Sequence, residues 1–184
     1  AYALAILEDE SLCHPALVVL ITVDEEIGLL GAAALDTAPL KGRYLINLDS
    51  EEEGYLWVGC AGGLTAQTNI PVKYQEAAGM KYEIAVSGLL GGHSGSEIDK
   101  NRANATLLLG RFLFEAREKG QYLLAELEGG QKDNAIPRMA RALILADCDT
   151  GEELRKFAGE FTENHRKEYT GRDEGNTVSV EARG

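Results

Sequence analysis

Residues 18–28 read VVLITVDEEIG, an apolar and mostly β-branched run that ends in three consecutive carboxylates and a glycine. Such a short apolar run predicts a buried strand of an α/β sheet. Ligands of open α/β sheets gather beyond the carboxyl ends of the strands, and Asp24, Glu25 and Glu26 would lie there. The same carboxylates could instead open a helix over residues 27–36, because acidic side chains are favoured at a helix N-terminus.

A second acidic cluster ends another apolar run, in residues 44–54, which read YLINLDSEEEG. The helical connection between the two runs gives a βαβ pattern, so the two strands are expected to be parallel and to end at one sheet edge. Carboxylates delivered to one edge by two strands predict a site for a divalent cation such as zinc, manganese or magnesium. Glu51, Glu52 and Glu53 themselves are interpreted as a solvated acidic loop.

The composition excludes several classes of partner. The chain has 184 residues and a formal net charge of -12, which argues against binding to nucleic acid or to anionic membrane surfaces. No apolar run approaches the length that spans a bilayer. Cys13, Cys60 and Cys148 are scattered without metal-ligand spacing, which favours the reduced thiols of a cytoplasmic protein.

The two ends of the chain lack the usual start and stop signals of a domain. Residues 1–9 already follow a helical pattern without an N-cap, and residues 177–181 predict a strand with almost nothing after it. We therefore expect an internal segment of a longer protein. The first 62 residues would lack flanking strands and are expected to be poorly ordered, aggregated or rearranged.

A glycine-rich stretch, GCAGG at residues 59–63, predicts a hinge that divides the chain into residues 1–62 and 63–184. Before the hinge, the pattern predicts a helix at 1–9 and strands at 17–23, 43–48 and 55–59. After it, the pattern predicts strands at 64–74, 81–86, 122–126, 141–146 and 178–180, and helices at 98–118 and 151–167. The strand at 81–86 is indicated by the alternation of Tyr82, Ile84 and Val86. From residue 81 onward this order is the β-α-β-β-α-β of ferredoxin-like domains.

The second candidate motif is GLLGGHSG at residues 88–95, between a predicted strand and a predicted helix. Glycines on both sides of His93 permit unusual backbone angles and let a substrate approach closely. An imidazole held there could donate a hydrogen bond to a developing oxyanion. The simpler alternative is a glycine-rich loop with an incidental histidine.

Together, these motifs resemble the di-zinc metallopeptidases of family M20, which include aminoacylases, tripeptidases and carnosinases. The resemblance rests on the acidic strand ends, the hinge glycines, GGHSG at 91–95 and NAIPR at 134–138. The strings at 45–54, 58–63 and 91–98 resemble one branch, the Xaa-His dipeptidases. The resemblance implies part of a parallel α/β catalytic sheet in residues 1–62. It implies a ferredoxin-like lid or dimerisation domain in residues 63–184.

The resemblance also implies roles for the acidic residues. Glu25 matches the general base that takes a proton from a metal-bound water. Glu26 and Asp49 match ligands to two different zinc ions, with manganese or cobalt as alternatives. Asp24 is interpreted as a supporting residue or helix cap.

Three residues of the second half are candidates for contact with the substrate. His93 matches the lid histidine that stabilises the tetrahedral oxyanion, across the subunit interface in dimeric members. Asn134 lies in a stretch that is near the substrate in this family. Arg138 is a candidate clamp for the substrate carboxylate on chemical grounds, because a guanidinium binds carboxylate with two hydrogen bonds.

Several ligands of the family have no counterpart here, namely a His-x-Asp pair, a bridging Asp and a final His. His14 and His165 lack a matching context and are expected at the surface. The parent is thus expected to be a cytoplasmic, metal-dependent dipeptidase of Xaa-His or β-alanyl substrates that dimerises through residues 63–184, and this chain is expected to be inactive. The open alternatives are a tripeptidase or aminoacylase, a lid or dimerisation module alone, and an acidic binding domain without metal chemistry.

Overall fold

The computed structural model describes residues 2–49, 52–60, 62 and 64–184. The chain separates into two compact units, unit 1 (Ala1–Thr68) and unit 2 (Asn69–Gly184). Ala61 and Gly63 of the predicted hinge lie outside the described residues, as do Ser50 and Glu51 of the second acidic cluster. The division at residues 62 and 63 therefore stays a prediction.

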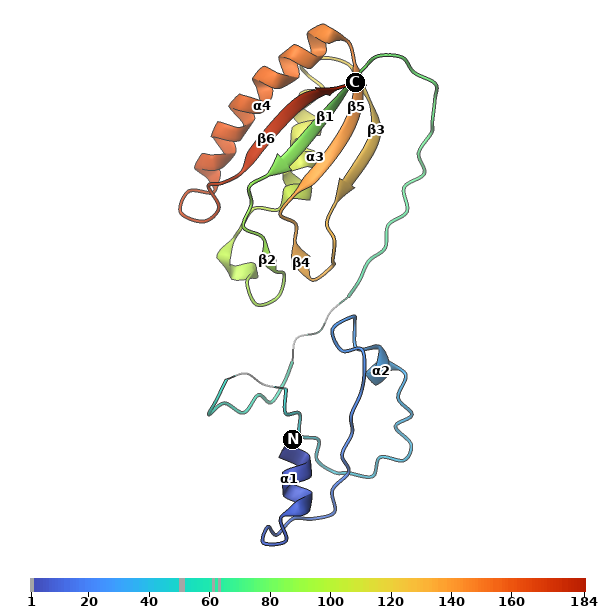
Figure 1. Cartoon of the computed structure of the whole chain (residues 1–184), viewed down its shortest axis with the longest axis vertical. Helices are drawn as coiled ribbons and strands as arrows, with labels where there is room; N and C mark the ends of the chain where they lie inside the picture. The colour runs from blue at the N-terminus through green and yellow to red at the C-terminus, as the bar shows by residue number, and fades with distance from the viewer. Residues whose placement is uncertain (1, 50–51, 61, 63) are drawn as a thin grey trace. The chain divides into compact units, whose positions relative to one another are not determined.

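Unit 2 is built on a four-stranded antiparallel sheet with the strand order β3-β5-β1-β6. Its strands are β1 (Met80–Ser87), β3 (Tyr122–Gly129), β5 (Ala140–Ala146) and β6 (Thr177–Arg183). Helix α3 (Ala105–Ala116) connects β1 to β3, and helix α4 (Cys148–Glu168) connects β5 to β6. This order confirms the predicted ferredoxin-like arrangement, and Figure 1 shows β1 and β5 between the two edge strands.

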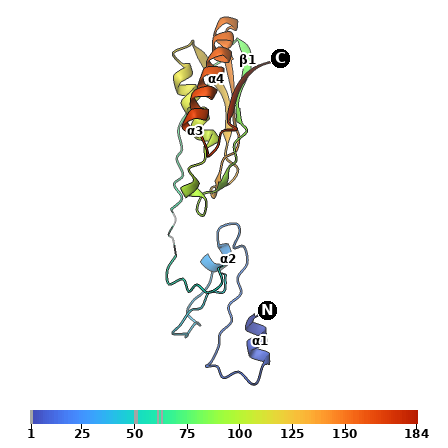
Figure 2. The same ribbon diagram turned by 90° about the vertical axis from the view of Figure 1, so that its left-hand side faces the viewer.

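The two helices cover one face of this sheet, as Figure 2 shows. Along β1, Tyr82, Ile84 and Val86 are buried, whereas Glu83 and Ala85 between them are partly exposed. The register pairs Ile84 with Ala142 of β5 and Val180 of β6, so buried residues of three strands lie in one row. The alternation read from the sequence thus identifies the covered face correctly.

Aromatic rings join the two helices above the sheet. The ring of Phe112 in α3 lies 5.2 Å from that of Phe157 and 5.3 Å from that of Phe161, both in α4. Such offset and edge-to-face pairs add to the free energy gained from burying apolar area. No helix in the described part of the chain is long and apolar enough to cross a membrane.

The predicted helix at 98–118 is in fact two shorter pieces. A 3-10 turn, η1 (Ile98–Lys100), ends at Asn101, whose φ of 49° is left-handed. Helix α3 then starts after Asn104, whose side chain accepts a hydrogen bond from the Leu107 N–H at 3.1 Å. Asparagine favours both conformations because its short amide replaces backbone partners locally, and this explains the break.

The prediction that His165 lies at the surface is wrong. His165 is 5% exposed, and its ring stacks on that of Phe161 with centroids 3.8 Å apart. Its Nδ1 lies 2.8 Å from the Phe161 carbonyl oxygen. The reason is helical spacing, since residues four apart share one face of α4 and Phe161 is in the core. His14 is exposed, as predicted.

Unit 1 contains two helices and no strand among its described residues. Helix α1 (Tyr2–Glu8) confirms the helix predicted at 1–9, and α2 (Leu30–Ala33) is a short part of that predicted at 27–36. The strands predicted at 17–23, 43–48 and 55–59 are not formed, and the described residues of 64–74 form none either.

The missing strands of unit 1 have a physical explanation. A parallel strand is stabilised by pairing on its edges and by helices on both faces of the sheet. The short helices α1 and α2 bury no residue of their own, so they provide no cover for a sheet. Ile21 and Leu45 are accordingly 87% and 89% exposed. The expected parallel βαβ unit is therefore corrected to an irregular segment.

Substitution of Phe112 tests the core of unit 2. Phe112→Ala should lower the free energy of unfolding by about 3–5 kcal/mol, because it removes a ring from between two helices and leaves a cavity. The matched control is Phe114→Ala on the same helix, where the ring is 70% exposed, and it should cost less than about 0.5 kcal/mol. Denaturant unfolding at low protein concentration measures both, and equal losses would contradict the assigned core.

Candidate functional site

A small two-stranded sheet in unit 2 brings two predicted site segments together. Strand β2 (Gly92–His93) pairs antiparallel with β4 (Ala135–Ile136), so that His93 lies opposite Ala135. The pairing continues for one more hydrogen bond, from the Ser94 N–H to the Asn134 carbonyl at 3.0 Å. The GGHSG and NAIPR motifs, separate in the sequence, are therefore neighbours in the fold.

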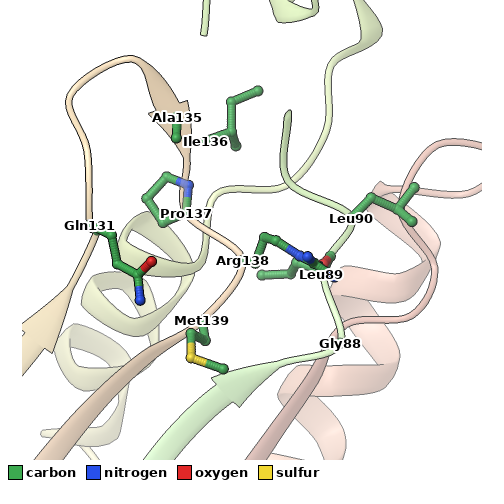
Figure 3. Close-up of a pocket in the computed structure, with 10 residues that line it drawn as sticks. Gly88, Leu89, Leu90, Gln131, Ala135, Ile136, Pro137, Arg138 and Met139 are labelled. Carbon is green, nitrogen blue, oxygen red and sulfur yellow. The ribbon is translucent and has the colours of Figure 1, made fainter. Parts of the chain in front are cut away.

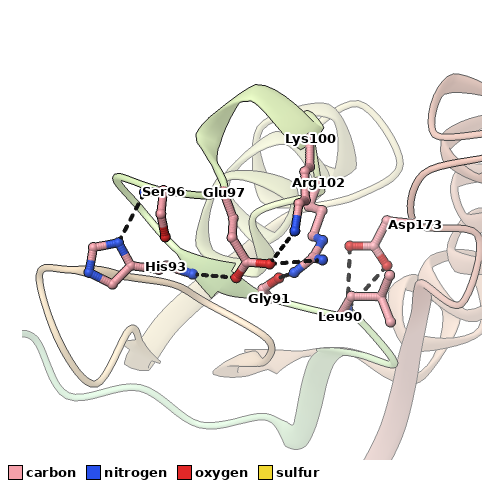
Figure 4. Close-up of polar contacts among 8 residues, drawn as sticks. All are labelled: Leu90, Gly91, His93, Ser96, Glu97, Lys100, Arg102 and Asp173. Carbon is pink, nitrogen blue, oxygen red and sulfur yellow. Dashed lines mark hydrogen bonds and ion pairs between the residues drawn. The ribbon is translucent and has the colours of Figure 1, made fainter. Parts of the chain in front are cut away.

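The imidazole of His93 is held by the turn that follows it. Its Nδ1 accepts hydrogen bonds from the backbone N–H groups of Gly95 at 3.0 Å and Ser96 at 3.2 Å. A nitrogen that accepts from two N–H groups carries no proton, so the neutral ring has its proton on Nε2. Figure 4 shows the ring pointing away from Glu97. The Nε2–H is thus free to donate to a ligand.

The glycines before His93 are required by close packing. Gly91 and Gly92 have φ values of 65° and 151°, which side chains rarely adopt. A Cβ on Gly92 would lie 2.7 Å from both an Arg102 nitrogen and a Glu97 carboxylate oxygen, and one on Gly91 would collide with the Arg138 side chain. Both glycines thus let side chains of other segments reach the backbone at this point.

Glu97 is the centre of a polar cluster beneath the His93 turn. Its carboxylate accepts hydrogen bonds from the His93 N–H at 2.9 Å and from Lys100 Nζ at 2.7 Å, and it lies 3.1 Å from the Arg102 guanidinium. The pKa of the Glu97 carboxyl is lowered from an ordinary 4.5 to about 2. The causes are the hydrogen bond from Lys100, the hydrogen bond from the His93 N–H and the positive charge of Arg102. Glu97 therefore stays ionised at any physiological pH.

A second carboxylate, Asp173, fixes both ends of the loop that carries this cluster. Asp173 is 2% exposed, and it accepts hydrogen bonds from the N–H of Leu90 at 3.2 Å and of Ala103 at 3.2 Å. Buried carboxylates require such partners, because burial without them is costly. The loop from Leu90 to Ala103 is thus closed by a residue from the connection between α4 and β6.

Arg138 lies at a pocket of about 590 Å³ beside this loop, shown in Figure 3. Its Nε donates to the Leu89 carbonyl at 3.3 Å, which leaves the other guanidinium nitrogens available to a ligand. The pocket has the size of typical small-molecule sites. Its wall is mostly apolar and includes Leu89, Leu90, Ile136, Pro137 and Met139. Asn134 does not line the pocket, but it directly precedes Ala135, which does.

The predicted acidic residues lie in unit 1 and are exposed. Glu25 and Glu26 belong to a turn in which the N–H groups of Gly28 and Leu29 both donate to the Glu25 carbonyl at 3.1 Å. The N–H of Asp49 donates to the Asn47 side chain at 2.8 Å. Among the residues that the structure describes, no three His, Cys, Asp or Glu side chains gather as a metal site would require. Glu52 and Glu53 are exposed, in keeping with a solvated loop.

Glu97, Arg102 and Asp173 were not identified from the sequence. Glu97 follows His93 by four residues, a spacing close to that of a helix capping box, and this signal could have revealed it. Asp173 is 83 positions from Leu90, whose N–H it binds, and no local pattern connects the two residues.

Three comparisons place the chain among known proteins. Residues 84–173 match the family model described as the peptidase dimerisation domain, M20 dimer. The chain is 41% identical over 165 residues to the cytosol non-specific dipeptidase of Escherichia coli (strain K12), covering 89% of this chain and 34% of that protein. It superposes on the crystal structure of aminoacylhistidine dipeptidase from Vibrio alginolyticus with a TM-score of 0.71 and 33% identity, covering 99% of this chain and 38% of that one. The chain thus spans about a third of the length of these relatives.

The depressed pKa of Glu97 can be tested by titration. Because the folded pKa of about 2 lies below the ordinary 4.5, the ionised carboxylate stabilises the fold above about pH 4.5, and this contribution is lost as the pH falls towards 2. Lys100→Ala should raise the pKa of Glu97, since it removes the hydrogen bond that lowers it most. Carboxyl-carbon NMR measures the midpoint. The control is Lys156→Ala, which breaks a comparable pair with Glu153 and should leave the pKa of Glu97 unchanged. A shift of the Glu97 pKa in the control alone would contradict the assignment.

Proposed function

Because this chain belongs to the M20 peptidases and contains their dimerisation domain at residues 84–173, we propose that it is part of a metal-dependent dipeptidase. The observation that carries the proposal is the 41% identity to a dipeptidase along most of the chain. The whole protein would hydrolyse Xaa-His or β-alanyl dipeptides, and the chain by itself would be inactive. The name of the Escherichia coli relative, a cytosol dipeptidase, supports a cytoplasmic location.

Unit 2 would supply groups that bind the substrate and stabilise charge. His93 presents its Nε2–H away from the turn, so it can donate to the oxyanion that forms when the peptide carbonyl is attacked. Arg138, which lines the neighbouring pocket, would bind the C-terminal carboxylate of the peptide. Asn134 would hold the substrate from the strand end beside His93.

Unit 1 would supply the base and part of the metal site. In this proposal Glu25 accepts a proton from the attacking water, which a carboxylate near neutral pH can do. Glu26 and Asp49 would each bind one of two zinc ions, with manganese or cobalt as alternatives. Two carboxylates are fewer than the three or four protein ligands of a zinc site, and the described residues gather no further ligands around them. We therefore assign this chain no step that passes through the metal.

The proposal is tested on the whole protein with a panel of Xaa-His dipeptides, tripeptides and N-acyl amino acids. We expect turnover of the dipeptides, and kcat should fall about 10²–10⁴-fold in Glu25→Gln and about 10²–10³-fold in His93→Ala. His14→Ala changes an exposed histidine of unit 1 and serves as the control with unchanged kcat. Turnover of tripeptides or N-acyl amino acids alone would replace the dipeptidase by a tripeptidase or aminoacylase.

We also propose that unit 2 forms a homodimer, which the match to a dimerisation domain supports. Strand β3 is an edge of the sheet, and edge strands offer unpaired backbone groups to a partner. Beside it, α3 exposes the apolar side chains of Leu107 and Phe114, at 57% and 70%. Phe114 lines one surface pocket together with Leu124, which is 51% exposed. This α3–β3 surface is the part of unit 2 that a second copy would cover.

A charged substitution on the α3–β3 surface tests the dimer. Phe114→Lys combined with Leu124→Lys should shift the protein towards the monomer, because association would then bury two unpaired ammonium groups. Met80→Lys, at an exposed apolar residue of β1, is the control and should leave the association unchanged. Sedimentation equilibrium measures the dissociation constant. A parent that is monomeric at high concentration would contradict the proposal, as would equal weakening by the control.

A further inference from the structure

We propose that Glu97 is a positioning residue that keeps the His93 imidazole in the Nε2–H tautomer and aims that N–H out of the turn. The inference rests on the proposed role of His93 as the donor to the oxyanion. It goes further because it names the group that makes His93 a donor. Glu97 itself faces the backbone, and Figure 4 shows its carboxylate on the opposite side of the His93 main chain from the ring.

The turn from His93 to Glu97 is closed in the manner of a helix N-terminus. The Glu97 N–H donates to the His93 carbonyl at 3.1 Å, and the His93 Nδ1 accepts from the next free N–H groups, those of Gly95 and Ser96. The Glu97 side chain then returns to the His93 N–H at 2.9 Å. In a capping box, a side chain at each end of the turn satisfies an N–H of the other end in the same reciprocal way. Here the cap is an imidazole nitrogen.

Two cations hold the Glu97 carboxylate in this position. Lys100 Nζ is 2.7 Å away, and the Arg102 guanidinium, whose side chain is 20% exposed, is 3.1 Å away. Arg102 also donates to the Gly91 carbonyl. The pair of Glu97 and Arg102 therefore fixes the backbone on both sides of Gly92, since one partner binds the residue after it and the other the residue before it.

The tautomer decides what the exposed nitrogen can do. A neutral ring with its proton on Nε2 offers a hydrogen-bond donor, whereas the other tautomer offers a lone pair that would repel an oxyanion. Without the Glu97 carboxylate, the His93 N–H and Arg102 lose their common partner, and the turn is free to open. The N–H groups of Gly95 and Ser96 would then no longer be held at Nδ1, and both tautomers would be populated.

The test is an NMR measurement on this chain labelled with ¹⁵N-histidine. The ring nitrogens of His93 are assigned by their loss in His93→Gln, and the spectra are taken at about pH 9, above the ordinary imidazole pKa of about 6.5. The variants are Glu97→Ala, Glu97→Gln, whose amide oxygen can still accept from the His93 N–H, and Glu153→Ala. Glu153 is the matched control because it also pairs with a lysine three residues away.

In the unmodified chain we expect widely separated shifts for the two ring nitrogens, with the directly bonded proton on Nε2. In Glu97→Ala both shifts should move to the averaged values of free histidine, while Glu97→Gln and Glu153→Ala should keep the separation. The buried His165 reports in the same spectra whether each variant is folded. If Glu97→Ala does not fold, Lys100→Ala together with Arg102→Ala removes the support of Glu97 and should give the same averaging.

Several results would overturn the inference. They are averaged shifts in the unmodified chain, a proton on Nδ1, unchanged shifts when Glu97 or both its cations are removed, and equal averaging in Glu97→Gln and Glu97→Ala. None of these results depends on hydrolysis. A whole protein without dipeptidase activity would therefore refute the proposed function and leave the tautomer result standing. Conversely, one of the overturning NMR results, found for an active dipeptidase, would refute the inference about Glu97 and leave the proposed function standing.

Discussion

The buried carboxylate of Asp173 binds the N–H groups of Leu90 and Ala103, which begin and end the loop that carries His93. Because Asp173 is almost fully buried, losing either donor would leave an ionisable group underpaired in the core, and such losses are costly. The base of the loop is therefore tied to the connection between α4 and β6, which is distant in the sequence but adjacent in the fold. Strand β2, which pairs with β4, and the turn after His93 both lie within this closed loop.

A second carboxylate acts within the loop under different conditions. Glu97 is partly exposed and surrounded by Lys100 and Arg102, so its charge is offset by ion pairs at the surface. Asp173 receives only backbone N–H groups among its described hydrogen bonds at the loop. The difference in burial between the two carboxylates matches the parts of the loop that they bind. The buried Asp173 carboxylate holds the two ends of the loop. The partly exposed Glu97 carboxylate binds the His93 N–H in the turn, where a substrate would need access.

Sequence reasoning succeeded where a pattern is local and repeated. The alternation of Tyr82, Ile84 and Val86 identified β1 and its buried face, and the order of elements from residue 81 identified the ferredoxin-like arrangement. It failed where strands need partners that the sequence pattern does not guarantee. Residues 17–23 have the composition of a strand, yet they form no strand pairing with the described residues of unit 1, and Ile21 is largely exposed. β-Propensity describes fitness for a half-buried sheet surface, so it has no effect without a sheet.

The sequence by itself determined the motifs, the family they resemble, and the elements of unit 2, because these depend on residue types at short spacings. Only the tertiary structure decided which motifs meet. The two-residue strands β2 and β4 are too short to show any periodicity, yet their pairing sets His93 beside Ala135. Likewise, His165 is buried by its contact with Phe161, and Asp173 acts on residues far away in the chain. Contacts of this kind arise from packing and long-range hydrogen bonds, which depend on the whole fold and leave no local trace in the sequence.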